Sequence, residues 1–331
     1  MIRRLLLLLL LISFLAYGQS DELLQKLRAI PDIVGVTLIK TDSMFKAGYE
    51  IRIRQLLDHS KGVSKGGHTT LLYRYYFPND VDVSVPYVAP VNLAQEDPRI
   101  FTWLRSVGDP EWREKIKKYQ FALLQRKTEI LPLLDKLAQQ KGYQFAIGKA
   151  LVYEYAVLEY PFTFWQYGGA KYSDIPSPQA PADSLLMHLE KVVGFSMYSD
   201  QSVTFYHPFF YQAYTEIGYY GYDITEFRGL LTAVKDPTNI ILAPKVHYVY
   251  NPSTMQNVYS WLRDYGNNII YIYGGNDTWS ATAMELSGKT NAIKIVKPGG
   301  FHGTTIGSLP PEQKELVLTT LEHWLNLKID R

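Results

Sequence analysis

The stretch 62–67, which reads GVSKGG, constrains the fold of this chain more than any other. It fits the pattern G-x-S-x-G, in which a strand turns sharply into a helix and raises a serine hydroxyl above a sheet. The turn strains the backbone, and a Cβ beside the serine would collide with the neighbouring helix or strand, so glycines flank it. A plain surface turn has a similar composition, so the interpretation depends on what surrounds Ser64 in the chain.

Helices and strands alternate in the segments that follow Ser64. Residues 65–77 carry leucines and tyrosines at helical spacing and lead into Pro78, which predicts a helix that ends there. Residues 81–88 are rich in β-branched side chains, as expected of a buried strand. Further along, the sequence predicts helices over 252–264 and 310–327 and buried strands over 268–273 and 292–296. This alternation favours an α/β fold with a mainly parallel sheet.

A long helical segment separates the two α/β parts. Apolar spacing predicts helices over 110–140, 181–193 and 212–220, and many aromatic residues lie between 153 and 167. We interpret 97–245 as a helical lid inserted into a core formed by 19–96 and 246–331. The aromatic residues are expected either to line a pocket or to pack the lid against itself.

The N-terminus has the three-part layout of a secretory signal peptide. Arg3 and Arg4 precede an apolar run over 5–15, and small residues follow near Gly18. The run is shorter than the roughly 20 apolar residues that a spanning helix needs. We therefore expect residues 1–18 to be removed and the protein to be secreted or periplasmic, without a membrane span after cleavage. A short helix over 21–29 and a half-exposed strand over 45–57 are predicted next.

Two side chains after predicted strands could form a hydrolytic site with Ser64. An acyl-transfer serine needs a base to take its proton and an acid to orient that base. Asp277 follows the strand over 268–273 and His302 follows the strand over 292–296, so both are expected where open α/β sheets keep their active sites. The order serine, aspartate, histidine is that of the α/β-hydrolase triad. Alternatively, Asp277 fits an ordinary turn and His302 a loop histidine bonded to backbone.

The composition gives no support for a cofactor, a metal or a nucleic acid. The chain has no cysteine and no H-E-x-x-H motif, and its 7 histidines are scattered. Neither a dinucleotide-binding glycine fingerprint nor a phosphate-binding loop is present. A net charge of +2 without clustered basic residues gives no reason to expect nucleic acid. No cofactor is therefore predicted, and the sequence leaves the oligomeric state open.

Longer motifs add a family resemblance. They read VSKGG at 63–67, YFPNDVDV at 76–83, LEYPF at 158–162, FWQYG at 164–168, YIYG at 271–274 and GGFHG at 299–303. Together they resemble the secreted tripeptidyl aminopeptidases, serine peptidases that are similar to prolyl carboxypeptidases and dipeptidyl peptidases. The resemblance covers about 21–59 and nearly everything from residue 60 onward. It implies an α/β-hydrolase fold with a helical lid.

The resemblance also implies an activity. Peptidases of this family release short peptides, often tripeptides and sometimes with proline near the cut, from free N-termini. Ser64 would be the nucleophile, and the amide of Lys65 would contribute to the oxyanion hole. The ammonium of the substrate needs a carboxylate in the lid, because a buried cation must be paired. Glu159 and Glu216 are the candidates, with an ordinary ion pair as the alternative for each.

The chain departs from the family just before the elbow. In the family several strands and helices separate the segment resembling 49–59 from the elbow, whereas here that segment runs almost directly into Gly62. At about 30 residues per βαβ unit, this apparent internal deletion corresponds to about three units. It would remove neighbours of the elbow strand and one oxyanion donor.

Two other hypotheses therefore stand beside the peptidase. One is an impaired or inactive remnant that at most binds peptides. The other is an esterase or lipase, which the bulky, tyrosine-rich lid disfavours.

Overall fold

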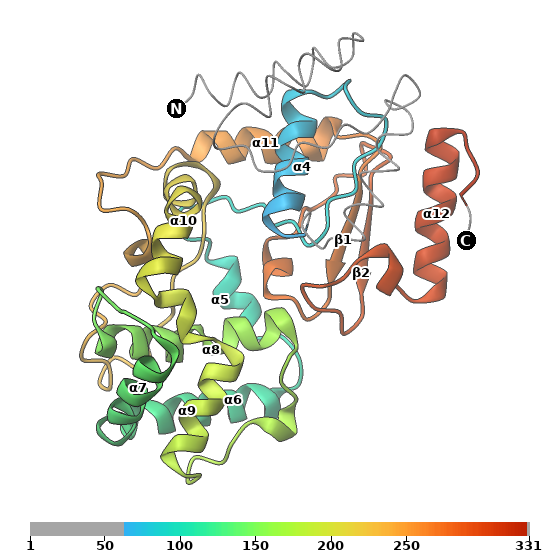
Figure 1. Cartoon of the computed structure of the whole chain (residues 1–331). Helices are drawn as coiled ribbons and strands as arrows, with labels where there is room; N and C mark the ends of the chain where they lie inside the picture. Colours follow the sequence, from blue (N-terminus) through green and yellow to red (C-terminus); the bar gives the residue numbers. More distant parts are fainter. Residues whose placement is uncertain (1–62, 330–331) are drawn as a thin grey trace, which may run out of the picture. The chain divides into compact units, whose positions relative to one another are not determined.

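The computed structural model describes residues 63–329 of the chain. These residues are mostly helical and include a small sheet of two parallel strands, which is compatible with the predicted α/β class (Figure 1). The predicted signal peptide, the helix over 21–29, the strand over 45–57 and the junction before the elbow lie outside the described residues. None of the helices within 63–329 combines the length and apolar character needed to cross a membrane.

The sheet consists of β1 (Ile270–Gly274) and β2 (Ile293–Lys297), paired in parallel with Ile270 opposite Ile293. All of β1 is buried, as its sequence IYIYG predicts. The prediction that β2 is also buried is wrong, because Lys294 and Val296 are exposed and only Ile295 is fully buried. This alternation fits a strand with one solvated face.

The segment predicted as a buried strand, residues 81–88, lies beside β1 and pairs with it through isolated bridges. Tyr87 bridges Ile272 of β1 on one side and Val63 on the other, in parallel in both cases. Pro86 interrupts the ladder because it has no N–H to donate. The residue before the elbow, this segment, β1 and β2 therefore run in one direction, so their carboxyl ends lie at the same edge.

Three predicted helices accompany these strands. They are α4 (Lys65–Tyr76), α11 (Pro252–Tyr265) and α12 (Pro311–Leu325). The start of α11 is set locally, since the Asn251 side chain accepts a hydrogen bond from the Ser253 amide at 3.1 Å and Pro252 occupies the first helical position. Tyr75 of α4 packs edge-on against Trp261 of α11, with ring centroids 5.8 Å apart.

The segment between these parts is helical, as predicted. Its helices are α5 (Arg99–Leu104), α6 (Pro110–Gln125), α7 (Lys127–Lys141), α8 (Lys149–Tyr167), α9 (Ala182–Val192) and α10 (Asp200–Gln212). A π-helical turn (Ala213–Ile217) continues α10. Short 3₁₀ turns cover Tyr172–Asp174, Phe195–Tyr198, Asn239–Leu242, Thr278–Thr282 and Ile306–Ser308.

Two helix predictions in this segment need correction. The continuous helix expected over 110–140 is broken at Arg126, whose backbone leaves the helical region and whose guanidinium donates to the carbonyls of Pro178 and Ala180. The helix expected over 212–220 is only the π-helical turn, which Gly218 ends with φ 69°. In both places tertiary contacts or a glycine override the apolar spacing.

The aromatic region over 153–167 forms most of α8. Thirteen of the helix's residues are buried, among them Tyr153, Tyr160 and Trp165. A helix that is apolar on all sides is expected to be buried among other helices. Accordingly, α8 contacts α6, α7 and α9. Its last two turns also carry side chains that reach the loops after β1 and β2.

Candidate active site

Ser64 lies at a strained turn between the extended residue Val63 and helix α4. Its backbone has φ 67° and ψ −113°, which a residue with a Cβ rarely adopts. The Ser64 amide donates to the Tyr87 carbonyl at 3.1 Å, and the Ser64 carbonyl accepts from the His68 amide at 2.9 Å. Both sides of the turn are thus held by hydrogen bonds, and such strain persists only where the surroundings enforce it.

Gly67 allows α4 to approach the neighbouring extended segment. A Cβ at this position would lie 2.5 Å from the Tyr87 carbonyl oxygen and 3.0 Å from the Ala89 Cβ. Any larger residue would therefore push the first turn of α4 away from the sheet. The glycine acts here through close packing, since its φ lies outside the left-handed region.

Asp277 and His302 are joined in the folded chain. Asp277 Oδ2 and His302 Nδ1 lie 2.8 Å apart, although 24 residues separate them in the sequence. Asp277 is fully buried and its other oxygen accepts from the Trp279 amide at 3.2 Å. This arrangement places the proton of His302 on Nδ1 and leaves Nε2 as the basic nitrogen.

The loops that carry this pair meet at a glycine. A Cβ on Gly274, the last residue of β1, would lie 2.6 Å from the carbonyl oxygens of Gly300 and Phe301. The His302 amide donates to the Gln166 carbonyl of α8 at 2.8 Å. The Thr278 hydroxyl donates to the Phe162 carbonyl at 2.8 Å. Helix α8 thereby fixes both loops.

Burial dominates the electrostatics of the pair. It raises the pKa of Asp277 above its usual range, while the hydrogen bond from His302 acts in the opposite direction. Ser64 forms no hydrogen bond with His302 among the described residues. Both side chains follow parallel extended segments that end at the same edge of the sheet.

Lys65 follows Ser64 as the first residue of α4, where a backbone amide has no acceptor within the helix. Its side chain is half-buried. Burial lowers the pKa of the Lys65 ammonium, and the nearby charge of Glu216 partly offsets this. Glu216 itself is exposed in the π-helical turn. The structure therefore places Glu216 next to Lys65, at the start of the elbow helix.

Glu159 has a different environment on α8. Its carboxylate accepts hydrogen bonds from three hydroxyls: Tyr222 at 2.7 Å, Tyr220 at 2.9 Å and Thr163 at 3.0 Å. Burial raises the pKa of Glu159 to about 7 despite these donors. Within the described part of the chain it forms no ion pair, so the site is a carboxylate held by neutral hydroxyls.

An aromatic cluster links Glu159 to the Asp277 loop. The ring of Trp279 packs against Tyr220 with centroids 5.4 Å apart and against Phe162 at 5.2 Å. Tyr167, which is 61% exposed, places its ring 6.1 Å from that of His302. Tyr167 therefore borders the Asp277–His302 pair from the end of α8.

The hydroxyls of Tyr220 and Tyr222 and the Gln166 carbonyl were not predicted from the sequence. Tyr167 belongs to the aromatic region that was expected to line a pocket or to pack the lid. A signal for the first two exists in the aromatic run over 219–222, and Thr163 lies four residues after Glu159 on the same helix face. The Gln166 carbonyl carries no sequence signal. In residues 63–329, no cluster of three or more His, Cys, Asp or Glu side chains could hold a metal ion.

Two comparisons with known proteins bear on this site. The model of the PS-10 peptidase S37 family matches residues 39–329. A prolyl tri/tetrapeptidyl aminopeptidase from Streptomyces mobaraensis is 30% identical over 274 residues. The matched region is 80% of this chain and 57% of that protein, so the chain spans little more than half the length of this relative.

Proposed function

Because this chain belongs to the PS-10 peptidase S37 family, we propose that it is a serine peptidase that releases tripeptides, some of them proline-containing, from free peptide N-termini. The buried hydrogen bond between Asp277 and His302 carries this proposal, together with the strained backbone of Ser64 at the same sheet edge. These are the residues that a hydrolytic triad requires. No cofactor has a role in this chemistry.

The reaction proceeds through an acyl-enzyme. Ser64 Oγ attacks the carbonyl carbon of the scissile bond while His302 Nε2 takes the serine proton, and Asp277 stabilises the resulting imidazolium. The tetrahedral intermediate collapses, the C–N bond breaks, and His302 returns the proton to the leaving amine. Water, deprotonated by His302, then attacks the acyl carbon and releases the N-terminal peptide with a new carboxylate.

The amide of Lys65 is the oxyanion donor in this proposal. It lies directly after the nucleophile and at the positive end of α4, where anions are stabilised. The second donor of such a site comes from an earlier strand–helix loop, which the apparent internal deletion before Gly62 would remove. Loss of one such donor costs on the order of a hundredfold in rate.

Glu159 receives the ammonium of the substrate. Its carboxylate is half-buried, has hydroxyl donors that fix its orientation, and lacks a cation within the described residues. An incoming ammonium would supply the missing charge. Glu216 is the second candidate, but it is exposed and its charge acts on Lys65 at the start of α4.

The architecture proposed for this activity is an α/β-hydrolase core with a lid. Residues 19–96 and 246–331 form the core, and 97–245 form the lid. Residues 1–18 act as a signal peptide, so the protein works in a secreted or periplasmic location on peptide substrates.

A catalytically impaired remnant that only binds peptides is the second candidate. The observation that favours it is the junction at which the segment resembling 49–59 runs almost directly into Gly62. A missing oxyanion donor and missing strands would lower activity without removing the aromatic lid.

A fluorophosphonate probe separates the two candidates. The wild-type peptidase should be labelled covalently on Ser64, and Ser64→Ala should not be labelled. Ser199→Ala is the matched control, because Ser199 also precedes a helix, α10, but belongs to the lid. If wild type and Ser64→Ala are labelled equally, or if neither is labelled, the peptidase proposal is wrong.

A further inference from the structure

A cavity of about 370 Å³ lies within the helical segment, between α5, α6, α8 and residues 220–227. The α8 residues that line it are Leu158, Pro161, Phe162 and Trp165. Their spacing of three and four places them on one face of the helix. Glu159 does not line this cavity. A volume of this size lies within the range of natural ligand pockets.

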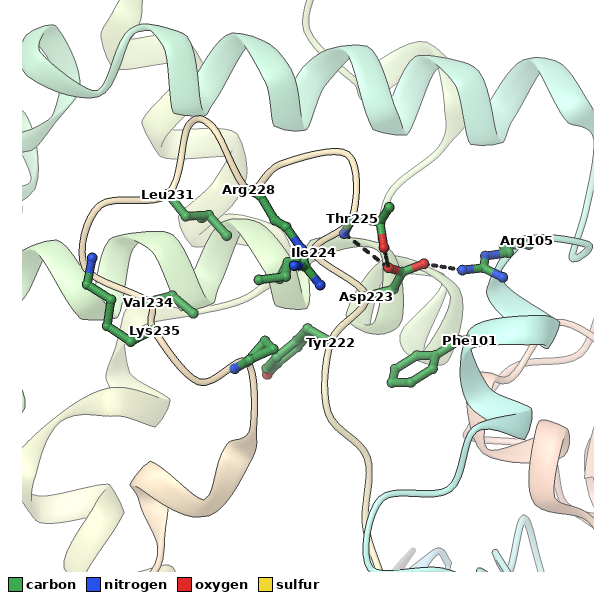
Figure 2. A pocket seen from close by; sticks show the side chains of 11 residues that line it. Phe101, Arg105, Tyr222, Asp223, Ile224, Thr225, Arg228, Leu231, Val234 and Lys235 are labelled. Carbon is green, nitrogen blue, oxygen red and sulfur yellow. Dashed lines mark hydrogen bonds and ion pairs between the residues drawn. The ribbon is translucent and has the colours of Figure 1, made fainter.

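A second pocket of about 580 Å³ adjoins this cavity. The two share Phe101, Arg105, Tyr222 and Asp223 as lining residues. Figure 2 shows the second pocket, with the Arg105 guanidinium bonded to the Asp223 carboxylate beside the rings of Phe101 and Tyr222. The space next to α8 therefore continues toward the surface of the helical segment.

Phe162 and Tyr220 line this space, and Tyr220 also contacts Glu159. Their rings stack with centroids 3.9 Å apart and an interplanar angle of 9°. Both line the 370 Å³ cavity, and the Tyr220 hydroxyl donates to Glu159. We call this stacked pair the aromatic wall. Tyr222, which lines the same cavity, also donates to Glu159, whereas Glu159 itself does not line the cavity.

We propose that the aromatic wall sets the length of the released peptide, by stopping the substrate N-terminus at Glu159 and closing off the cavity behind it. This inference rests on the proposed peptidase function. A peptide anchored at Ser64 by its scissile carbonyl and at Glu159 by its ammonium has a fixed number of residues between the two points. An extra residue would need the volume that the wall now separates from the site.

The cavity can accept the end of a longer peptide. Its lining includes the carboxylates Glu114, Asp223 and Glu226, together with the basic side chains Arg105, Arg113 and Lys117. Asp223 is bonded to Arg105 and Glu226 to Lys117. Glu114 is paired with Lys118, so an ammonium that passes the wall has to share carboxylates that already hold a cation. The lining is nevertheless polar, so the desolvation cost that excludes charges from apolar cavities does not apply in full.

The test uses the full-length protein and nested peptides that share one scissile bond and carry two, three, four or five residues before it. Wild type should cleave one length best, three residues on the proposed function. The measured quantity is the length ratio, which is kcat/KM for the next longer peptide divided by kcat/KM for the preferred peptide. Phe162→Ala should raise this length ratio at least tenfold. Phe162→Leu should produce a smaller change in the same direction.

Two further variants test whether the change in length ratio is specific to the aromatic wall and the cavity. Phe164→Ala removes an equally buried phenylalanine from α8 that packs on Trp112 and Trp165 and lines neither pocket, so it should leave the ratio unchanged. Leu104→Trp, added to Phe162→Ala, refills the cavity from α5 and should restore the wild-type preference.

If Phe162→Ala and Phe162→Leu both keep the wild-type length ratio and melt like Phe164→Ala, the proposed role of the aromatic wall is wrong. The proposed peptidase function would still stand. If wild type cleaves none of the nested peptides at the shared bond, the proposed function fails and the inference fails with it. The wild-type measurement therefore distinguishes the two failures.

Discussion

Ser64 has a strained backbone conformation at the position of the proposed nucleophile. A non-glycine residue at φ 67° costs of order 1–3 kcal/mol, which the hydrogen bond to Tyr87 and the close contact at Gly67 hold in place. Asp277 is disfavoured for another reason, because burial opposes its charge and raises its pKa, against the hydrogen bonds with His302 and the Trp279 amide. Both penalties fall on residues of the proposed triad.

Asp277→Asn tests the orienting role. Asparagine keeps the shape but presents an N–H or a neutral oxygen to His302, which favours the wrong tautomer, so kcat should fall about 10⁴-fold with little change in KM. Steady-state kinetics on a free peptide measures this. Asp223→Asn, at an exposed ion pair, is the control and should retain near wild-type kcat. A loss below tenfold in Asp277→Asn would contradict the triad assignment.

Glu159→Gln tests ammonium binding and separates the two glutamate candidates. Removal of the charge should lower kcat/KM for a free N-terminus on the order of a hundredfold, as for a buried charge pair. Glu216→Gln should change it by no more than about fivefold, as expected of a surface charge. The reverse order of effects would assign the ammonium site to Glu216. Acetylated peptides should be resistant to the wild type.

The pH profile follows from the same carboxyl group. Burial raises the pKa of Glu159 to about 7, so the group is neutral and cannot bind an ammonium below that pH. In wild type, kcat/KM should fall as pH decreases below about 7, and the Glu159→Gln profile should lack this component. Any fall that persists in the variant belongs to another group. Identical profiles for the two proteins would argue against ionised Glu159 as the ligand.

At the scale of elements, α8 is the organising helix. It supplies Glu159 and the wall residue Phe162, and its carbonyls at 162 and 166 fix the loops of Thr278 and His302. Its own position depends on Glu154, which is fully buried and accepts hydrogen bonds from the amides of residues 232–234 as well as from Lys127. This carboxylate ties α8 to α7 and to the chain that follows Tyr222.

Glu154→Gln should destabilise the protein on the order of 3 kcal/mol, because it leaves Lys127 without its partner and turns an N–H donor toward backbone amides. Thermal unfolding measures this. Glu129→Gln, which removes an exposed carboxylate next to Arg126, should leave the melting temperature nearly unchanged. The hydrogen bonds lower the pKa of Glu154 although burial acts to raise it, so its stabilisation is present above the unfolded pKa and is lost as pH falls through the folded pKa. Equal melting temperatures for the two variants would contradict this role.

At the scale of the whole molecule, the chain combines a short parallel sheet with a larger helical segment. The family resemblance inferred from the motifs is confirmed by the match over residues 39–329. The proposed export gives a further prediction. A host that processes signal peptides should yield a mature chain that begins near Gln19, as read by N-terminal sequencing or intact mass. Leu8→Arg, which interrupts the apolar run, should block processing. Recovery of wild type with Met1 in place would contradict the signal peptide.

The sequence alone determined the order of elements and the identity of the chemical groups. Local patterns sufficed for this: helical spacing predicted α4, α11 and α12, the apolar run predicted β1, and glycine-flanked Ser64 predicted the elbow. Asp277 and His302 could be named because each follows a strand, and parallel strands end at one edge of a sheet. The family could be named because its motifs are long.

Only the tertiary structure decided which groups meet. The hydroxyls of Tyr220 and Tyr222 lie about 60 residues beyond Glu159, so no local pattern pairs them with the carboxylate. The break at Arg126 depends on carbonyls more than 50 residues away, and the exposure of β2 depends on what covers its two faces. The elbow itself is enforced from outside, because the strained φ of Ser64 persists only while Tyr87, Gly67 and the sheet hold the turn on both sides.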